Sequence, residues 1–208
     1  MKNFIYGVLT ILFLSTAVTV QSQDEISSYE MSYFNDSGNS KKSIQATEPN
    51  DKGLSTFYIY TSPLEGKHVS LIISSKDLEQ FKIAINSIKE IYTNWSQTAK
   101  ENGIVDLDKE IDFQKTKQTS AFYSSKWFFT TPIQLRARFK ILSNGDHVLI
   151  IQNKYKLVSS SNEFINNKGF LIVFNSVEEI DNFLNQLNIE LVYSHYENKD
   201  SKEDLFKQ

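Results

Sequence analysis

The chain has 208 residues, of which 40% are hydrophobic and 13% aromatic, enough for one globular domain with a substantial core. Its formal net charge is −3, from 22 basic and 25 acidic residues, and this balance gives no general argument for binding nucleic acid or an acidic membrane surface. No cysteine is present, so disulfides and lipidation on cysteine are excluded.

Residues 1–22 have the pattern of a secretory signal peptide. Lys2 supplies a positive charge, an apolar run follows over residues 4–14, and Val20 and Ser22 precede a suitable cleavage site. The apolar run is shorter than the roughly 20 residues of a membrane-spanning helix. We therefore expect cleavage and no transmembrane segment in the mature chain. Export without disulfides favours a bacterial periplasmic or secreted protein.

Residues 23–55 are predicted to form an N-terminal strand followed by a polar linker. Tyr29, Met31 and Tyr33 alternate with polar residues, as in an edge strand. Residues 35–55 are rich in Asn, Ser, Asp, Lys and Gly without any period, so we expect a long loop. A single α+β domain is assigned to 56–195 and a charged tail to 196–208.

Residues 56–62 alternate as a strand, with Phe57 and Ile59 on one side and Tyr58 and Tyr60 on the other. A turn and a second strand, residues 68–73, follow. A long helix is then predicted from Ser74, as N-cap, to Gly103, as left-handed stop. One stripe of this helix is apolar: Leu78, Phe81, Ile85, Ile88, Tyr92, Trp95 and Ala99.

Four acids alternate after the helix: Asp106, Asp108, Glu110 and Asp112. A calcium loop of the EF-hand type requires glycine at its sixth position, which here is Ile111. We therefore favour a solvated acidic edge over a calcium site.

The clearest strand covers residues 133–141, and a turn at Asn144 and Gly145 predicts a hairpin. We prefer a three-residue loop that pairs Leu142 with Asp146, because it extends one apolar face. That face would hold Ile133, Ala137, Phe139, Leu149, Ile151 and Tyr155. The opposite face would hold six polar, mostly cationic groups as a candidate ligand-binding site: Arg136, Arg138, Lys140, Gln152, Lys154 and Lys156. A solvated outer face is the alternative.

Aromatic residues suggest a second candidate site, a platform on which sugars could stack: Tyr58, Tyr60, Tyr123, Trp127 and Phe129. We favour a core position for Trp127 and Phe129, because they alternate on one face of a short strand. For Tyr58 and Tyr60 the platform and the core stay open alternatives.

After an apolar strand at 169–174, Asn175 is predicted to cap a second helix, with Glu178 as the acid of a capping box. No nucleophile, metal-binding or phosphate-binding motif is recognised. The three histidines, His68, His147 and His195, are far apart in sequence. We expect no metal and no cofactor.

The runs Thr98–Asn102, Lys156–Ser161 and Gly169–Leu184 resemble small exported proteins of Bacteroidetes-type bacteria. The resemblance covers most of the mature chain. It implies export and a single α+β domain, and it assigns no activity and no catalytic residue.

The fold expected is α+β, a mainly antiparallel sheet with the long helix and a C-terminal helix on one face. A β-sandwich or a lipid-binding barrel is the alternative. The function expected is an exported, non-enzymatic binding protein of the cell envelope, whose partner is an envelope component, a glycan or a protein. The alternatives are a hydrolase that acts on envelope or dietary polymers through paired acids such as Asp106 and Asp108, and a structural or inhibitor-like protein that docks a partner protein. The oligomeric state stays open.

Overall fold

The computed structural model describes residues 23–32, 39–123 and 126–204. The predicted signal peptide lies outside the described residues. The strands are β1 (Gln23–Ser32), β2 (Asn39–Thr47), β3 (Thr56–Tyr60), β4 (Ser62–Pro63), β5 (Val69–Ser74), β6 (Leu107–Tyr123), β7 (Lys126–Phe129), β8 (Ile133–Ile141), β9 (His147–Asn153), β10 (Leu157–Val158), β11 (Asn166–Asn167) and β12 (Phe170–Phe174). The helices are a 3₁₀ turn η1 (Ser75–Asp77), α1 (Leu78–Glu101), α2 (Val177–Gln186) and α3 (Ile189–Asp204).

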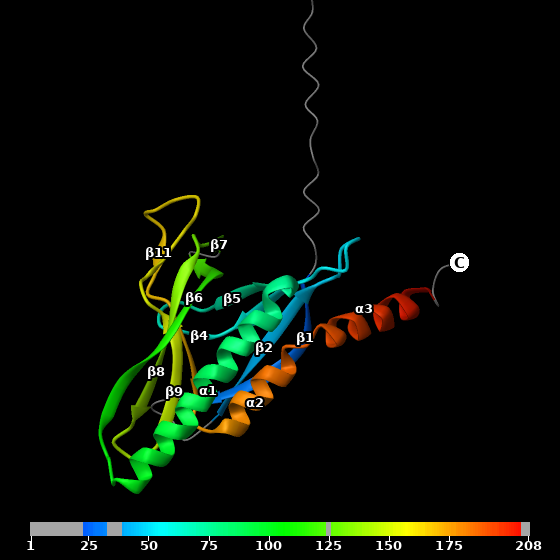
Figure 1. Cartoon of the computed structure of the whole chain (residues 1–208). Helices are drawn as coiled ribbons and strands as arrows, with labels where there is room; N and C mark the ends of the chain where they lie inside the picture. The colour runs from blue at the N-terminus through cyan, green and yellow to red at the C-terminus, as the bar shows by residue number, and fades with distance from the viewer. Residues whose placement is uncertain (1–22, 33–38, 124–125, 205–208) are drawn as a thin grey trace, which may run out of the picture.

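The predicted fold class is confirmed, because antiparallel strands form one large sheet and helices pack on it (Figure 1). The order of strands is β1-β2-β3-β5-β6-β8-β9-β12-β4, and β7 pairs with β6. Only Thr61 separates β3 from β4, yet β4 pairs with β12 at the other end of this order. The sheet therefore curls back on itself. β10 and β11 form a separate hairpin.

The long helix covers the inner face of the sheet, as its apolar stripe predicts. Trp95 is partly buried, and the other six stripe residues are buried. Phe139 of β8 makes ring contacts with Tyr92 and Trp95. In α2, Phe183 contacts Tyr29 of β1 and Phe174 of β12. Because Phe174 and Phe139 both lie opposite Leu149, the two helices share one face.

Tyr92 ties α1 to the rest of the fold through its hydroxyl. The hydroxyl lies 3.0 Å from the carbonyl oxygen of His147 and 2.8 Å from that of Asn175, and the two acceptors share its one hydrogen. Burial raises the pKa of Tyr92 to about 12, so the phenol stays a neutral donor at physiological pH.

The helix ends agree with the sequence in part. Ser74 caps the short η1 turn, and Gly103 has the expected left-handed backbone, with φ of +60°. The predicted cap of α2 is wrong by one residue. Ser176 Oγ accepts from the backbone N–H of Glu179, and Glu179 accepts from the N–H of Asn175. The same spacing of cap and acid was available one position further on, and the structure uses it.

Two predicted boundaries are wrong. The polar linker contains β2, in which Ile44 and Ala46 are fully buried against β3. The charged tail begins inside α3, where Tyr196 is buried and donates to the carbonyl of Ala46 at 2.9 Å. The N-terminal strand, the linker segment and the start of the tail therefore belong to the same core. Within the described residues, none of the helices has the length and apolar character needed to cross a bilayer.

The predicted register of the β8–β9 hairpin is confirmed. Phe139 pairs with Leu149, and the backbone N–H of Leu142 donates to the carbonyl of Asp146 at 2.8 Å. Gly145 adopts φ of +86°, the left-handed position of the three-residue loop. Tyr155 does not join the core, because β9 ends at Asn153 and Tyr155 is exposed beyond it.

Candidate functional site: an aromatic cluster on the outer face

The alternation of β3 places two tyrosines on the outer face of the sheet. Phe57 and Ile59 are fully buried on the inner face, so Tyr58 and Tyr60 point the other way and are half-buried. Tyr60 lies opposite Ser70 of β5, and Ser70 lies opposite Ser120 of β6. Along this register, the outer face of the sheet continues from Tyr58 and Tyr60 across β5 and β6 to β7.

The β6–β7 hairpin adds further rings to the same face. Ser120 pairs with Phe129, Ala121 with Phe128 and Phe122 with Trp127. Phe128 is buried on the inner side with Ala121. Trp127 and Phe129 therefore face outward, where they are 43% and 48% exposed. The predicted core position of these two residues is wrong, because Phe128 takes the inward position.

Trp127 is the centre of a network of rings. Its ring centroid lies 5.5 Å from Phe122, 6.0 Å from His68 and 6.1 Å from Tyr60. The ring of His68 stacks on Trp127 at an interplanar angle of 28°, and that of Tyr60 is nearly perpendicular at 89°. We call the outer-face set the aromatic cluster: Tyr58, Tyr60, His68, Phe122, Trp127 and Phe129.

Polar groups accompany these rings. The hydroxyl of Tyr60 donates to Oε1 of Gln45 at 3.3 Å. Burial raises the pKa of Tyr58, and burial and then the neighbouring Tyr58 raise the pKa of Tyr60, so both hydroxyls are neutral. Ser70 and Ser120, buried between Tyr60 and Phe129, share a hydrogen bond of 2.7 Å. The side chain of Tyr123, a predicted member, lies outside the described residues.

Tyr29 fixes the backbone that carries Tyr60. Its buried hydroxyl donates to the carbonyl of Tyr60 at 2.8 Å, and burial raises its pKa. The end of β3 is thereby held by β1 as well as by its ladder to β5. The strand that carries Tyr58 and Tyr60 is therefore hydrogen-bonded to β5 and to Tyr29 of β1.

The predicted basic face exists only in part. Arg136, Arg138, Lys140 and Gln152 share the outer face of β8 and β9. Nε and Nη2 of Arg138 lie 2.9 and 2.7 Å from Oδ1 of Asp108, and Nζ of Lys140 lies 3.6 Å from its Oδ2. With the amide of Gln152 turned toward it, Arg136 places Nε 3.1 Å from the amide oxygen. Much of the positive charge on this face is thus already paired.

Lys154 and Lys156 do not belong to that face, and this part of the prediction is wrong. β9 ends at Asn153, whose side-chain amide donates to the carbonyls of Tyr155 and Lys168. The chain turns away there and both lysines are exposed. Val148 and Ile150 pair with Lys140 and Arg138 and so lie on the same face, where both are buried.

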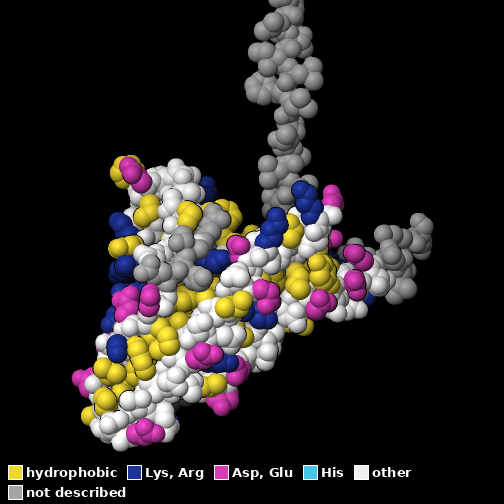
Figure 2. Space-filling view, viewed as in Figure 1, with side chains coloured by type: hydrophobic (Ala, Val, Ile, Leu, Met, Phe, Trp, Pro, Cys, Tyr) yellow, Lys and Arg dark blue, Asp and Glu magenta, His cyan; other side chains and the backbone are white. Residues whose placement is uncertain are grey.

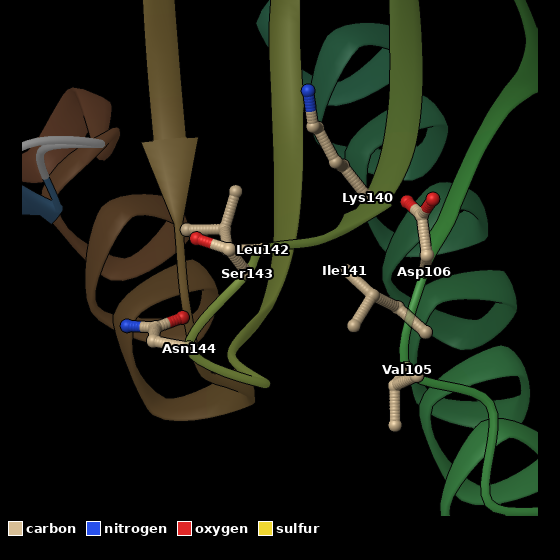
Figure 3. Close-up of a pocket in the computed structure, with 7 residues that line it drawn as sticks. All are labelled: Val105, Asp106, Lys140, Ile141, Leu142, Ser143 and Asn144. Atoms are coloured by element: carbon tan, nitrogen blue, oxygen red, sulfur yellow. The ribbon is translucent and has the colours of Figure 1, made fainter.

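The acids of residues 106–112 are divided among separate surroundings. Asp106 lines an open hollow of about 800 Å³ and is the single carboxylate among the described residues that line it (Figure 3). Asp108 pairs with Arg138, and Asp112 lines a different hollow of about 230 Å³ beside α1. Asp106 and Asp112 therefore lie in different hollows and do not face each other across one.

The histidines lie in three different places. His68 is in the aromatic cluster, His147 packs on Phe139, and Nε2 of His195 lies 3.2 Å from Oδ2 of Asp24. No group of three or more potential metal ligands converges in the part of the chain that the structure describes.

No family model matches this chain, and comparisons with curated proteins and with solved structures find no match. The resemblance to exported proteins of Bacteroidetes-type bacteria therefore stays a prediction from the sequence. The function must therefore be inferred from the residues and geometry of the site.

Proposed function

We propose that this chain is a non-enzymatic binding protein of the cell envelope and that its aromatic cluster binds carbohydrate. The observation that carries the proposal is the outward position of Trp127 and Phe129, each exposed by more than two fifths. Rings of this kind offer flat apolar area to the C–H faces of a sugar, and tyrosine adds a polar edge. Assignment to the envelope rests on the predicted signal peptide.

The cluster is organised before any ligand arrives. Trp127 is held by ring contacts with Phe122, His68 and Tyr60, so little side-chain entropy is lost when a sugar stacks on it. The neutral hydroxyls of Tyr58 and Tyr60 can donate and accept hydrogen bonds with sugar hydroxyls. Both properties suit an uncharged, hydroxyl-rich ligand.

The other candidate surfaces support this function less well. Arg138 and Lys140 are paired with Asp108, so an anionic ligand on the basic face would have to displace an internal partner. Asp106 and Asp112 line different hollows, which disfavours a hydrolase built on paired carboxylates.

The proposal is tested by measuring binding of the full chain to a panel of neutral oligosaccharides and to peptidoglycan. We expect Trp127→Ala to weaken binding at least about tenfold, because it removes both stacking and apolar area. Val105→Ser is the matched control, since Val105 is an exposed apolar residue that lines the hollow in Figure 3.

Three outcomes would count against the proposal. Binding to none of these carbohydrates would contradict it, as would binding that Trp127→Ala leaves unchanged. A sugar lost with Arg138→Glu but retained with Trp127→Ala would assign the ligand to the basic face instead.

A further inference from the structure

A small hairpin projects from the sheet next to the aromatic cluster. In it Leu157 pairs with Asn167 and Val158 with Asn166, and the connecting turn carries Phe164, which is 85% exposed. The turn is internally bonded, because the backbone N–H of Phe164 donates to Oδ1 of Asn162 at 3.1 Å. A large apolar ring is thus presented to solvent by an ordered turn.

Two more exposed apolar side chains lie at the base of this hairpin. Tyr155 is 67% exposed, and Leu64 is 46% exposed. Asn153 joins the carbonyls of Tyr155 and Lys168 with hydrogen bonds of 2.6 and 3.0 Å, and the N–H of Leu64 donates to the carbonyl of Gly169 at 2.8 Å. These contacts bring Tyr155 and Leu64 to the base of the hairpin whose turn carries Phe164.

Lysines lie at the base of the hairpin, beside Tyr155 and Asn167 in the sequence. Lys154 and Lys156 flank Tyr155, and Nζ of Lys154 lies 5.7 Å from the centroid of the tyrosine ring. Over the turn 64–68, Lys126 and the segment 154–168, the lysines outnumber the acids: Lys67, Lys126, Lys154, Lys156 and Lys168 against Glu65 and Glu163. The whole chain, by contrast, has a net charge of −3. Figure 2 shows hydrophobic and dark blue side chains interspersed at this end, with an acid at the tip.

We propose that this end of the molecule docks onto the surface of an anionic lipid bilayer. Phe164, Tyr155 and Leu64 would enter the boundary between headgroups and acyl chains, where exposed apolar and aromatic side chains are stabilised. The lysines would lie at the level of the lipid phosphates, to which their charge is complementary. Glu163 beside Phe164 opposes the attraction and sets a limit on its strength. The docking residues are distinct from the aromatic cluster, so this proposal goes beyond the carbohydrate function.

The test uses tryptophan as a local probe in the full chain. Phe164→Trp is made with Trp95→Phe and Trp127→Phe, so that emission comes from position 164 alone. Val105→Trp in the same background is the matched control, because Val105 is exposed beside the Asn144 turn rather than at the hairpin. Circular dichroism checks that each variant is folded. The probe is a vesicle of phosphatidylcholine and phosphatidylglycerol, with brominated acyl chains as quencher.

We expect emission from position 164 to shift to shorter wavelength and to be quenched, while position 105 changes little. Lys154→Glu together with Lys156→Glu, or a salt concentration of about 1 M, should weaken the quenching at least about tenfold. Quenching reports only on the position of the single tryptophan. Membrane binding by residues 1–22 would therefore not produce quenching at position 164 without quenching at position 105. Equal quenching at positions 105 and 164, or none at 164, would overturn the proposal. So would quenching equal on vesicles of phosphatidylcholine alone.

Discussion

At the scale of single residues, the candidate site depends on which of three consecutive aromatic residues points inward. Phe128 pairs with Ala121 and is buried, so Trp127 and Phe129 must face outward. An exposed tryptophan leaves apolar area in contact with water, and the proposed carbohydrate site would cover that area on binding. The same alternation places Tyr60 on that surface and Ile59 in the core.

His147 makes a prediction about stability and pH. Its Nδ1 is buried without a hydrogen-bond partner among the described residues, and its ring packs on Phe139. Burial and then Lys100 lower its pKa, with Asp146 acting in the opposite direction. The folded state therefore favours the neutral ring. Its contribution to stability is complete above the unfolded pKa of about 6.5 and decreases as the pH falls toward the lowered folded value.

The measurement is urea unfolding at about pH 7.5 and about pH 5. The wild type should lose more free energy of unfolding between these pH values than His147→Gln does. An equal loss in both proteins would mean that His147 does not titrate with folding.

At the scale of elements, the ends of strands and helices decide which side chains meet. β9 ends at Asn153 because the side chain of Asn153 bonds to Tyr155, Lys168 and Phe170, and this takes Lys154 off the basic face. Extending a strand's alternation past its end is what made the predicted basic face too long. Lys154 and Lys156 instead lie exposed at the base of the projecting hairpin.

The cap of α2 gives a prediction that separates the observed from the expected residue. Ser176→Ala should lower the free energy of unfolding by about 1 kcal/mol, because it removes the acceptor for the N–H of Glu179. Asn175→Ala is the control and should have a much smaller effect, since only the backbone N–H of Asn175 takes part in the capping box. Denaturant unfolding measures both, and the reverse order would restore Asn175 as the cap.

At the scale of the whole molecule, one core includes the first strands as well as the last helix. Ile44 of β2 pairs with Ile59, and Tyr196 of α3 bonds to the carbonyl of Ala46. The curled sheet brings β1, β3 and β12 around this core. The outer-face cluster is held rigid because the strands beneath it are part of that one sheet.

Ile44→Ala should therefore lower the free energy of unfolding by about 2–5 kcal/mol, as for other fully buried isoleucines. Lys41→Ser, an exposed position in the same strand, should stay within about 0.5 kcal/mol of the wild type. Thermal and denaturant unfolding measure the difference. If the two substitutions had equally small effects, residues 39–47 would behave as a linker after all.

The sequence predicts those features whose pattern is long. The stripe of α1 repeats over six turns, and the β8–β9 register follows from Gly145 together with a long alternation. β2 is hidden because only Ile44 and Ala46 show its period among polar residues. Trp127 is placed wrongly because three adjacent aromatic residues contain no alternation by which to choose the inward one. The outward position of Tyr58 and Tyr60 follows from the clear alternation of β3.

The most direct test of the central claim is whether Trp127 itself becomes covered when carbohydrate binds. The chain has two tryptophans, so Trp95→Phe leaves Trp127 as the only one. We predict that the bound oligosaccharide shifts its emission and protects it from iodide quenching, with a saturable dependence on sugar concentration. Emission and iodide quenching that stay unchanged at concentrations that saturate binding would contradict the assignment of the site to the aromatic cluster.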